Sequence, residues 1–102
     1  MKRRLVLATI LVFSFAFISG ALAADIKVGT LLSITGPLKE FGPPIQNGAD
    51  LAAKQITDAG LSIEVVHEDS ETAAQPAIGA AKKLVDIQKV VGIIGALSSG
   101  VT

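Results

Sequence analysis

The feature that most constrains the fold is an alternation of three short apolar runs with two longer segments of helical periodicity. The runs are rich in β-branched residues and predict strands at Ile26–Leu32, Leu61–His67 and Lys89–Gly95. The segments between them predict helices at Ile45–Ala59 and Ala73–Gln88. Strands that alternate with helices are typical of a parallel sheet covered on both faces and joined by right-handed crossovers. We therefore expect an α/β fold, β-α-β-α-β, that is the incomplete start of a doubly wound parallel sheet.

The first predicted helix combines a stripe of small apolar residues with clear signals at its ends. Pro44 can preset its first turn, and Gly60 is expected to end it in a left-handed conformation. Asp50 and Lys54 lie four residues apart on the polar face, opposite the apolar stripe. The stripe, which suits close packing on a sheet, consists of Ile45, Ala49, Ala52, Ala53 and Ile56.

The second predicted helix has two alternative starts. Thr72 and Gln75 fit a capping box, whereas Pro76 could instead open the helix with Gln75 before it. Its expected apolar face comprises Ala77, Ala81, Leu84, Val85 and Gln88.

The first 23 residues have the three parts of a secretion signal. Lys2–Arg4 are positive, Leu5–Ile18 are apolar and uncharged, and Ala21-x-Ala23 fits a signal peptidase site. We expect cleavage after Ala23 and export of residues 24–102; the resemblance described below implies that they are exported to the periplasm. A membrane anchor is the alternative, but a 14-residue apolar helix reaches only about 21 Å, short of the roughly 30 Å hydrocarbon core.

The composition of residues 24–102 excludes several classes of partner. Six lysines and no arginine stand against nine acidic residues, so the net charge is −3 and no basic patch exists for nucleic acid. Phe41 is the single aromatic residue after the signal, which leaves no base-stacking platform. The chain has no cysteine, so an exported domain must be stabilised by burial alone, and lipid anchoring at the signal is excluded.

Ligands of open parallel sheets bind beyond the carboxyl ends of the strands, where three segments are expected: Ser33–Phe41, His67–Thr72 and Gly95–Thr102. The third combines glycines with three hydroxyls. If a helix begins just after it, the segment suits a carboxylate or another anion. The alternative is a plain strand-to-helix turn, with Ser98 or Ser99 as the N-cap.

The other candidate motifs are weaker. There is no GxGxxG, no phosphate loop and no G-x-S-x-G around the serines, which disfavours nucleotide binding and a hydrolase elbow. His67 has no second histidine or cysteine to share a metal, so we predict no metal site and no cofactor. The acids Glu68, Asp69 and Glu71 are expected to form a solvated loop. Phe41 is either a lid on local core or the wall of a ligand cleft.

Several short motifs occur in an order that resembles the type I periplasmic binding proteins of the leucine/isoleucine/valine-binding branch. Thr57 departs from that pattern, because the family commonly has asparagine there, and a second glycine and a short hairpin insert are missing before the second strand. The matching motifs are Ile26–Gly29, Thr35–Pro37, Phe41–Gly42, Gly48–Ala52, Ile56–Gly60, His67–Asp69 and Ile94–Ser99.

The resemblance implies a non-enzymatic solute-binding component of an ABC importer. Such a protein closes two lobes on an amino acid, here of the branched-chain type, and delivers it to a membrane permease; it acts as a monomer when complete. Residues 24–102 would then be part of the N-terminal lobe. Ser99 aligns with the serine that holds the ligand α-carboxylate, with Ser98 beside it, and Phe41 aligns with an aromatic wall of the side-chain pocket. The acids that neutralise the ammonium group are expected beyond Thr102.

Two other readings of the function stay open at this point. One is a secreted α/β hydrolase with catalytic residues downstream, and the other is a ligand-sensing subunit of the same fold. Three strands with two helices are also expected to leave the third strand as an exposed apolar edge, which is unfavourable for independent folding.

Overall fold

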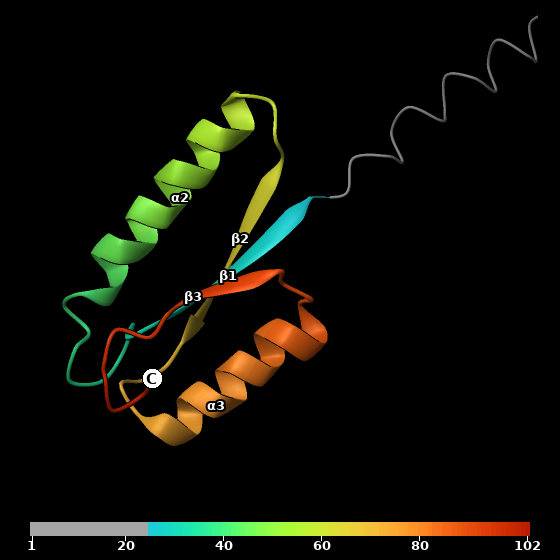
Figure 1. Cartoon of the computed structure of the whole chain (residues 1–102). Helices are drawn as coiled ribbons and strands as arrows, with labels where there is room; N and C mark the ends of the chain where they lie inside the picture. The colour runs from blue at the N-terminus through green and yellow to red at the C-terminus, as the bar shows by residue number, and fades with distance from the viewer. Residues whose placement is uncertain (1–24) are drawn as a thin grey trace, which may run out of the picture.

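The computed structural model describes residues 25–102, so the predicted signal peptide and its cleavage site at Ala23 lie outside the described residues. A parallel three-stranded sheet has the order β2-β1-β3, and its helices follow β1 and β2 in the chain (Figure 1). The predicted β-α-β-α-β order is confirmed. In chain order, the elements are β1 (Ile26–Leu32), α2 (Gly42–Asp58), β2 (Ile63–Asp69), α3 (Ala74–Lys82), a π-helical turn (Lys83–Ile87) and β3 (Gly92–Gly95).

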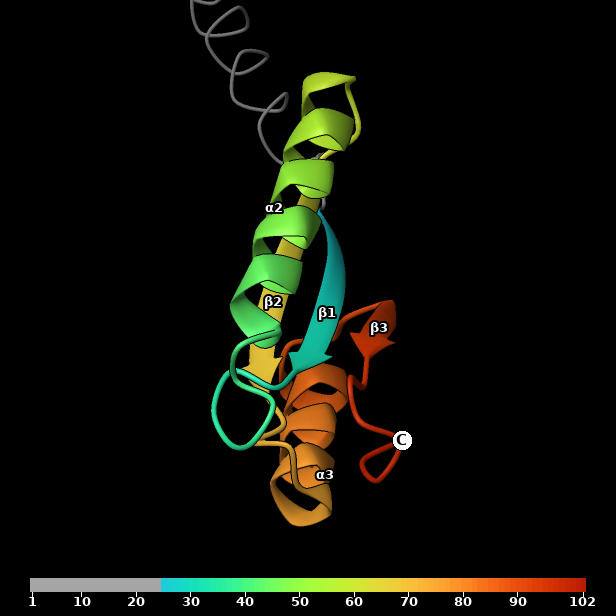
Figure 2. The ribbon, with the colours of Figure 1, turned by 90° about the vertical axis from the view of Figure 1, so that its left-hand side faces the viewer.

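The two helices lie on opposite faces of the sheet, as a doubly wound fold requires (Figure 2). Successive residues of a strand point to opposite faces, and β1 follows this rule. Leu31 belongs to the core beside α3, whereas Val28 and Thr30 face α2. β1 therefore lies at the centre of the structure, with a neighbouring strand on each side and a helix on each face of the sheet.

The core lies between the sheet and α3. Leu84 is fully buried, and Leu31 and Ala77 are 8% and 3% exposed. Leu84 packs closely against β1 because Gly29 of this strand has no side chain. A Cβ at Gly29 would lie 3.1 Å from both terminal carbons of Leu84. The partly buried residues around this centre are Val66, Ala80, Ala81, Val90 and Val101.

The predicted apolar stripe of α2 packs on the other face of the sheet, and this packing is looser than that of α3. An open apolar groove of about 150 Å³ runs between helix and sheet. Its lining consists of Val28, Ala49, Ala52, Ala53, Ile56, Ile63, Val65 and Ile94.

The start of α2 differs from the prediction, whereas its end agrees. The helix begins at Gly42 and not at Ile45, because Pro43 and Pro44 fit its first turn, where no backbone N–H has a partner within the helix. At the other end Gly60 has φ +110° and donates to the Thr57 carbonyl. A bond from Leu61 N–H to the Ile56 carbonyl completes a Schellman motif.

On the polar side of α2, the four-residue spacing of Asp50 and Lys54 does not give an ion pair between them. Lys54 forms its ion pair with Asp58, at 2.7 Å, and not with Asp50. Asp50 instead reaches across to His67 of β2. Lys54 lies four residues from both Asp50 and Asp58, so local spacing allows either partner. The contact of Asp50 with His67 decides in favour of Asp58.

Neither alternative start of α3 is observed. The capping box of Thr72 and Gln75 does not form, and the helix begins at Ala74, two residues before Pro76. The N-cap is Ala73, which makes no side-chain capping bond. The Thr72 hydroxyl instead accepts a bond from Leu38 N–H and donates one to the Thr35 carbonyl, both in the loop after β1. At the other end the helix widens into a π turn closed by a bond from Gln88 N–H to the Lys83 carbonyl. Val85, expected on the buried face, is 52% exposed beyond Leu84.

The third strand is shorter than predicted. Lys89 has φ +57°, and Val90 N–H bonds back to the Leu84 carbonyl, so Lys89 and Val90 belong to the turn out of the helix. Pairing with β1 starts at Val91, whose N–H bonds to the Lys27 carbonyl at 2.8 Å. β3 is an edge strand, and all four of its residues are exposed. The expected exposed apolar edge is thus confirmed, with Ile94 at 55% exposure. Between residues 25 and 102, neither helix has the length and apolar character needed to cross a bilayer.

We expect Leu84→Ala to lower the free energy of unfolding by about 2–5 kcal/mol, because it leaves a cavity in the centre of the core. Urea denaturation followed by circular dichroism measures this loss. The matched control is Val85→Ala, one residue along and exposed, which should change stability by no more than about 0.5 kcal/mol. Equal effects of the two substitutions would contradict the packing described above.

Candidate ligand-binding site

Parallel pairing brings the segments that follow the three strands to one edge of the sheet. Residues 33–41 follow β1, residues 70–73 follow β2 and residues 96–102 follow β3 (Figure 2). Each candidate ligand-binding residue, Phe41, Ser98 and Ser99, lies in one of these segments. This edge is where open α/β sheets bind small molecules.

The segment after β3 makes a helical turn around Ser98. The Ser98 hydroxyl accepts a bond from Gly100 N–H at 3.3 Å, and the Ser98 carbonyl accepts bonds from Val101 and Thr102 N–H at 2.9 and 3.2 Å. Ser98 therefore stands where an N-cap stands. Ser99 is exposed, and its hydroxyl makes no hydrogen bond with the residues that the structure describes.

Phe41 lies at the junction between the loop after β1 and helix α2. It is the N-cap residue of α2, and its N–H donates to the Leu38 carbonyl at 3.1 Å. Its side chain is 58% exposed.

The acidic segment differs from the expected solvated loop. β2 continues past His67 to Asp69, because Leu31 and Leu32 of β1 pair with Glu68 and Asp69. The Glu68 side chain is only 17% exposed and forms an ion pair with Lys83 at 2.5 Å. Of the three acids, Glu71 alone is exposed as a residue.

The Asp69 carboxylate is the most heavily hydrogen-bonded side chain at this edge. Its Oδ1 accepts bonds from the N–H groups of Ile34, Thr35 and Glu71, at 2.9, 3.2 and 2.8 Å. Its Oδ2 accepts a bond from the Thr35 hydroxyl at 2.6 Å. The sequence did not reveal this role because Ile34 and Thr35, which supply three of the four bonds, lie 35 and 34 residues away in the chain.

These bonds change the acidity of Asp69. Desolvation by partial burial is the largest single influence and would raise the pKa of this carboxyl, but the four hydrogen bonds together outweigh it. The pKa of Asp69 therefore lies below the ordinary value of 3.8.

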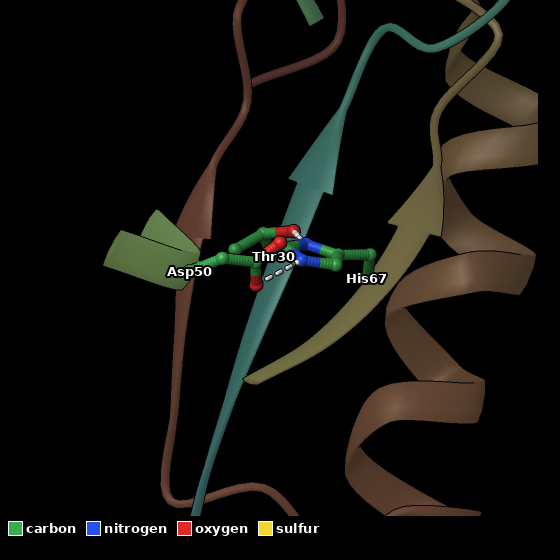
Figure 3. A network of polar contacts seen from close by, with 3 residues as sticks. All are labelled: Thr30, Asp50 and His67. Carbon is green, nitrogen blue, oxygen red and sulfur yellow. Dashed lines mark hydrogen bonds and ion pairs between the residues drawn. The ribbon is translucent and has the colours of Figure 1, made fainter. Parts of the chain in front are cut away.

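His67 joins helix α2 to the centre of the sheet (Figure 3). Its Nδ1 lies 2.6 Å from the Thr30 hydroxyl, and its Nε2 lies 2.8 Å from the Asp50 carboxylate. Thr30 is fully buried, so this Asp–His–hydroxyl series cannot present its hydroxyl to a substrate. Residues 25–102 contain no group of three metal-ligating side chains either. The network serves the fold, since it fastens the helix to β1 and β2.

A parallel sheet with a helix on each face, whose strand-end loops gather at one edge, belongs to the class of open, doubly wound α/β folds. Residues 25–102 match the periplasmic binding protein family, and the chain belongs to that family.

The relatives fall in the leucine/isoleucine/valine-binding branch. The chain is 36% identical over 91 residues to Leu/Ile/Val-binding protein homolog 7 of Brucella melitensis, covering 83% of this chain and 23% of that protein. It is 35% identical over 102 residues to the Leu/Ile/Val-binding protein BraC3 of Rhizobium johnstonii, covering 93% and 26%. The chain thus spans about a quarter of the length of these curated relatives.

Solved structures agree with this placement. The branched-chain amino acid transporter substrate-binding protein LivJ from Streptococcus pneumoniae, solved with isoleucine, has a TM-score of 0.71 at 33% identity. The match covers 76% of this chain and 24% of LivJ. The leucine-binding protein LivK from Thermotoga maritima has a TM-score of 0.66 at 29% identity, covering 74% and 22%. The predicted fold class and family are therefore confirmed.

We expect His67→Leu to cost about 1–3 kcal/mol of stability, because it leaves the buried Thr30 hydroxyl without a partner. Urea denaturation measures the cost. Adding Thr30→Val should recover part of it, since the unpaired hydroxyl is then gone. Asp50→Asn is the milder control: the Asp50 side chain is 57% exposed, so its loss should cost less than about 1 kcal/mol. A double variant no more stable than His67→Leu would contradict the pairing.

The acid stability of the chain should depend on Asp69. Because its pKa is lowered in the folded state, its contribution is fully present well above pH 3.8 and is lost as the pH falls through the folded value. Asp69→Asn should therefore flatten the decline in stability between about pH 5 and pH 2. Chemical denaturation at a series of pH values tests this. Glu64→Gln, an exposed acid of the same strand, should keep the parent slope.

Proposed function

We propose that this chain forms part of the amino-acid-binding lobe of a periplasmic solute-binding protein that serves an ABC importer. The observation that carries the proposal is the loop after β3, where an exposed Ser99 hydroxyl follows a helical turn capped by Ser98. A carboxylate is the ligand group that such a hydroxyl and nearby backbone N–H groups favour. The named relatives, which are Leu/Ile/Val-binding proteins, point to the same class of ligand.

In this proposal the three candidate residues have separate tasks. Ser99 donates a hydrogen bond to the α-carboxylate of the amino acid. Ser98 keeps its hydroxyl on Gly100 N–H and so shapes the turn that presents Ser99. Phe41 forms a wall of the side-chain pocket, a role that its 58% exposure favours over that of a lid on local core.

A branched-chain amino acid is the ligand we propose. The structural neighbours include a substrate-binding protein solved with isoleucine and a leucine-binding protein. Residues that neutralise the ammonium group would come from the remainder of a two-lobed protein, which closes around the ligand as a monomer. A membrane permease would then receive the amino acid.

The cellular location follows from the same proposal. Residues 1–23 would be the signal peptide, removed after Ala23, and residues 24–102 would form part of the N-terminal lobe in the periplasm. We propose no catalytic step, and the buried hydroxyl of the Asp50–His67–Thr30 network offers none.

The test is calorimetric titration of L-leucine into the protein expressed from its native reading frame. Ser99→Ala should weaken binding by about 1–3 kcal/mol, roughly 5- to 150-fold, through loss of a charge-assisted hydrogen bond. Ser62→Ala is the matched control, since Ser62 precedes β2 at the opposite edge of the sheet and bonds to Asp25. Unchanged affinity in Ser99→Ala, with binding intact in the parent, would return Ser99 to a purely structural turn.

A further inference from the structure

The loop that carries Phe41 is closed on itself and tied to the end of β2 by one carboxylate. We propose that Asp69 is a positioning residue: it does not touch the ligand, but it fixes the 33–41 loop and so the place of Phe41 at the ligand-binding edge. This inference rests on the proposed role of Phe41 as a wall of the pocket. The contacts below carry it.

The two ends of the loop meet at its base. A Cβ on Gly42 would lie 2.1 Å from the Ser33 carbonyl oxygen, so the chain returns to within contact of where it left β1. Two turns shape the interior, with bonds from Lys39 N–H to the Gly36 carbonyl and from Phe41 N–H to the Leu38 carbonyl. A compact loop with touching ends behaves as a unit, and loops of this kind are frequently functional.

Asp69 holds the first part of this loop, and Thr72 holds the middle. The carboxylate accepts bonds from Ile34 N–H, Thr35 N–H and the Thr35 hydroxyl. The Thr72 hydroxyl accepts a bond from Leu38 N–H and donates one to the Thr35 carbonyl, both at 3.3 Å. The first half of the loop after β1 is therefore bonded, at Ile34, Thr35 and Leu38, to the end of β2 and the turn after it.

The same carboxylate also holds the turn that supplies Thr72. Glu71 and Thr72 have φ angles of +52° and +58°, a left-handed conformation that is unfavourable for residues with a Cβ. Such a conformation persists where the surroundings fix it, and it is often found at functional sites. Here Asp69 Oδ1 accepts the Glu71 N–H, and the Ser70 hydroxyl oxygen accepts the Thr72 N–H.

The two loops approach so closely that only glycine fits between them. Gly36 has φ +84°, and a Cβ there would lie 2.2 Å from the Glu71 carbonyl oxygen. Asp69 thus sits at the junction of both loops and accepts hydrogen bonds from each.

Phe41 depends on this scaffold because its ring is exposed. With 58% of the residue open to solvent, the course of the backbone sets where the ring stands. Asparagine tests the role well, since it keeps the shape of Asp69 but replaces one acceptor oxygen by a donor amide. The backbone N–H groups then lose the negative charge that strengthens their bonds, and the amide nitrogen can only donate to the Thr35 hydroxyl oxygen instead of accepting from it.

The chain provides a clean reporter, because it contains no tryptophan and no tyrosine. In the 102-residue chain, Phe41→Trp introduces a single tryptophan at position 41. The anisotropy and the acrylamide quenching of its fluorescence are measured at neutral pH without ligand. Adding Asp69→Asn should lower the anisotropy and increase the quenching. Leu84→Ala is the control for general destabilisation, since it lies in the core beneath α3; it should leave both values at those of Phe41→Trp alone while circular dichroism shows a folded chain.

A second variant keeps the test decisive if Asp69→Asn does not fold. Thr35→Val removes only the hydroxyl bond to Oδ2 and leaves the three backbone bonds of Asp69 in place. It should change anisotropy and quenching in the same direction by a smaller amount. Unchanged signals in both variants, or equal changes in Leu84→Ala, would overturn the proposal.

Leucine titration of the natively expressed protein separates this inference from the proposed function. If both hold, Asp69→Asn weakens leucine binding by about two- to tenfold, the cost of ordering one side chain on binding. If the parent protein does not bind leucine but the reporter responds to Asp69→Asn, the proposed ligand is wrong and the positioning role stands. If leucine binds and the reporter does not respond, the positioning role is wrong.

Discussion

The parallel pairing of β1 with a strand on each side is the constraint on which the rest of the structure depends. The connections between these parallel strands place α2 on one face of β1 and α3 on the other, so residues of both faces are withdrawn from water. The register of the pairing also places Thr30 beside His67 and Leu32 beside Asp69. A shift by one residue would exchange the two faces, turning polar groups toward α3 and Leu31 toward α2. The core, the His67 network and the Asp69 junction are therefore consequences of one register.

Much of the fold could be predicted from local patterns. The apolar runs, the alanine stripe of α2 and the glycine after it each act within a few residues. Each run formed a strand, although with shifted ends in β2 and β3, and the stripe and the glycine were confirmed. The errors occurred where a distant contact outweighs a local signal. Thr72 had the spacing of a capping box, yet its hydroxyl bonds to Leu38 and Thr35, which lie 34 and 37 positions earlier in the chain. Likewise Asp50 turns from Lys54 to His67, and the strand expected from Lys89 begins only at Gly92.

The candidate site likewise has features that the sequence predicts and features that depend on distant contacts. That the loops carrying Phe41, Ser98 and Ser99 share an edge follows from parallel topology, and the structure agrees. Their ligand contacts came from the resemblance to a family and stay predictions. Asp69 was read from sequence as one of several solvated acids, because nothing local reveals that four donors converge on it. A carboxylate directly after a predicted buried strand was the available signal, and it was too common to interpret alone.

The position of β1 has a consequence for how the chain acquires its structure. It is the first strand to be synthesised, yet it occupies the centre of the sheet, and its two neighbours are made later. Until β2 emerges, the apolar strand has no partner, and the second neighbour follows only after a further helix. Closing such long loops is slow and leaves apolar surface open in the meantime. Holding the chain unfolded until it is fully made would therefore benefit this protein more than early folding of its N-terminal end.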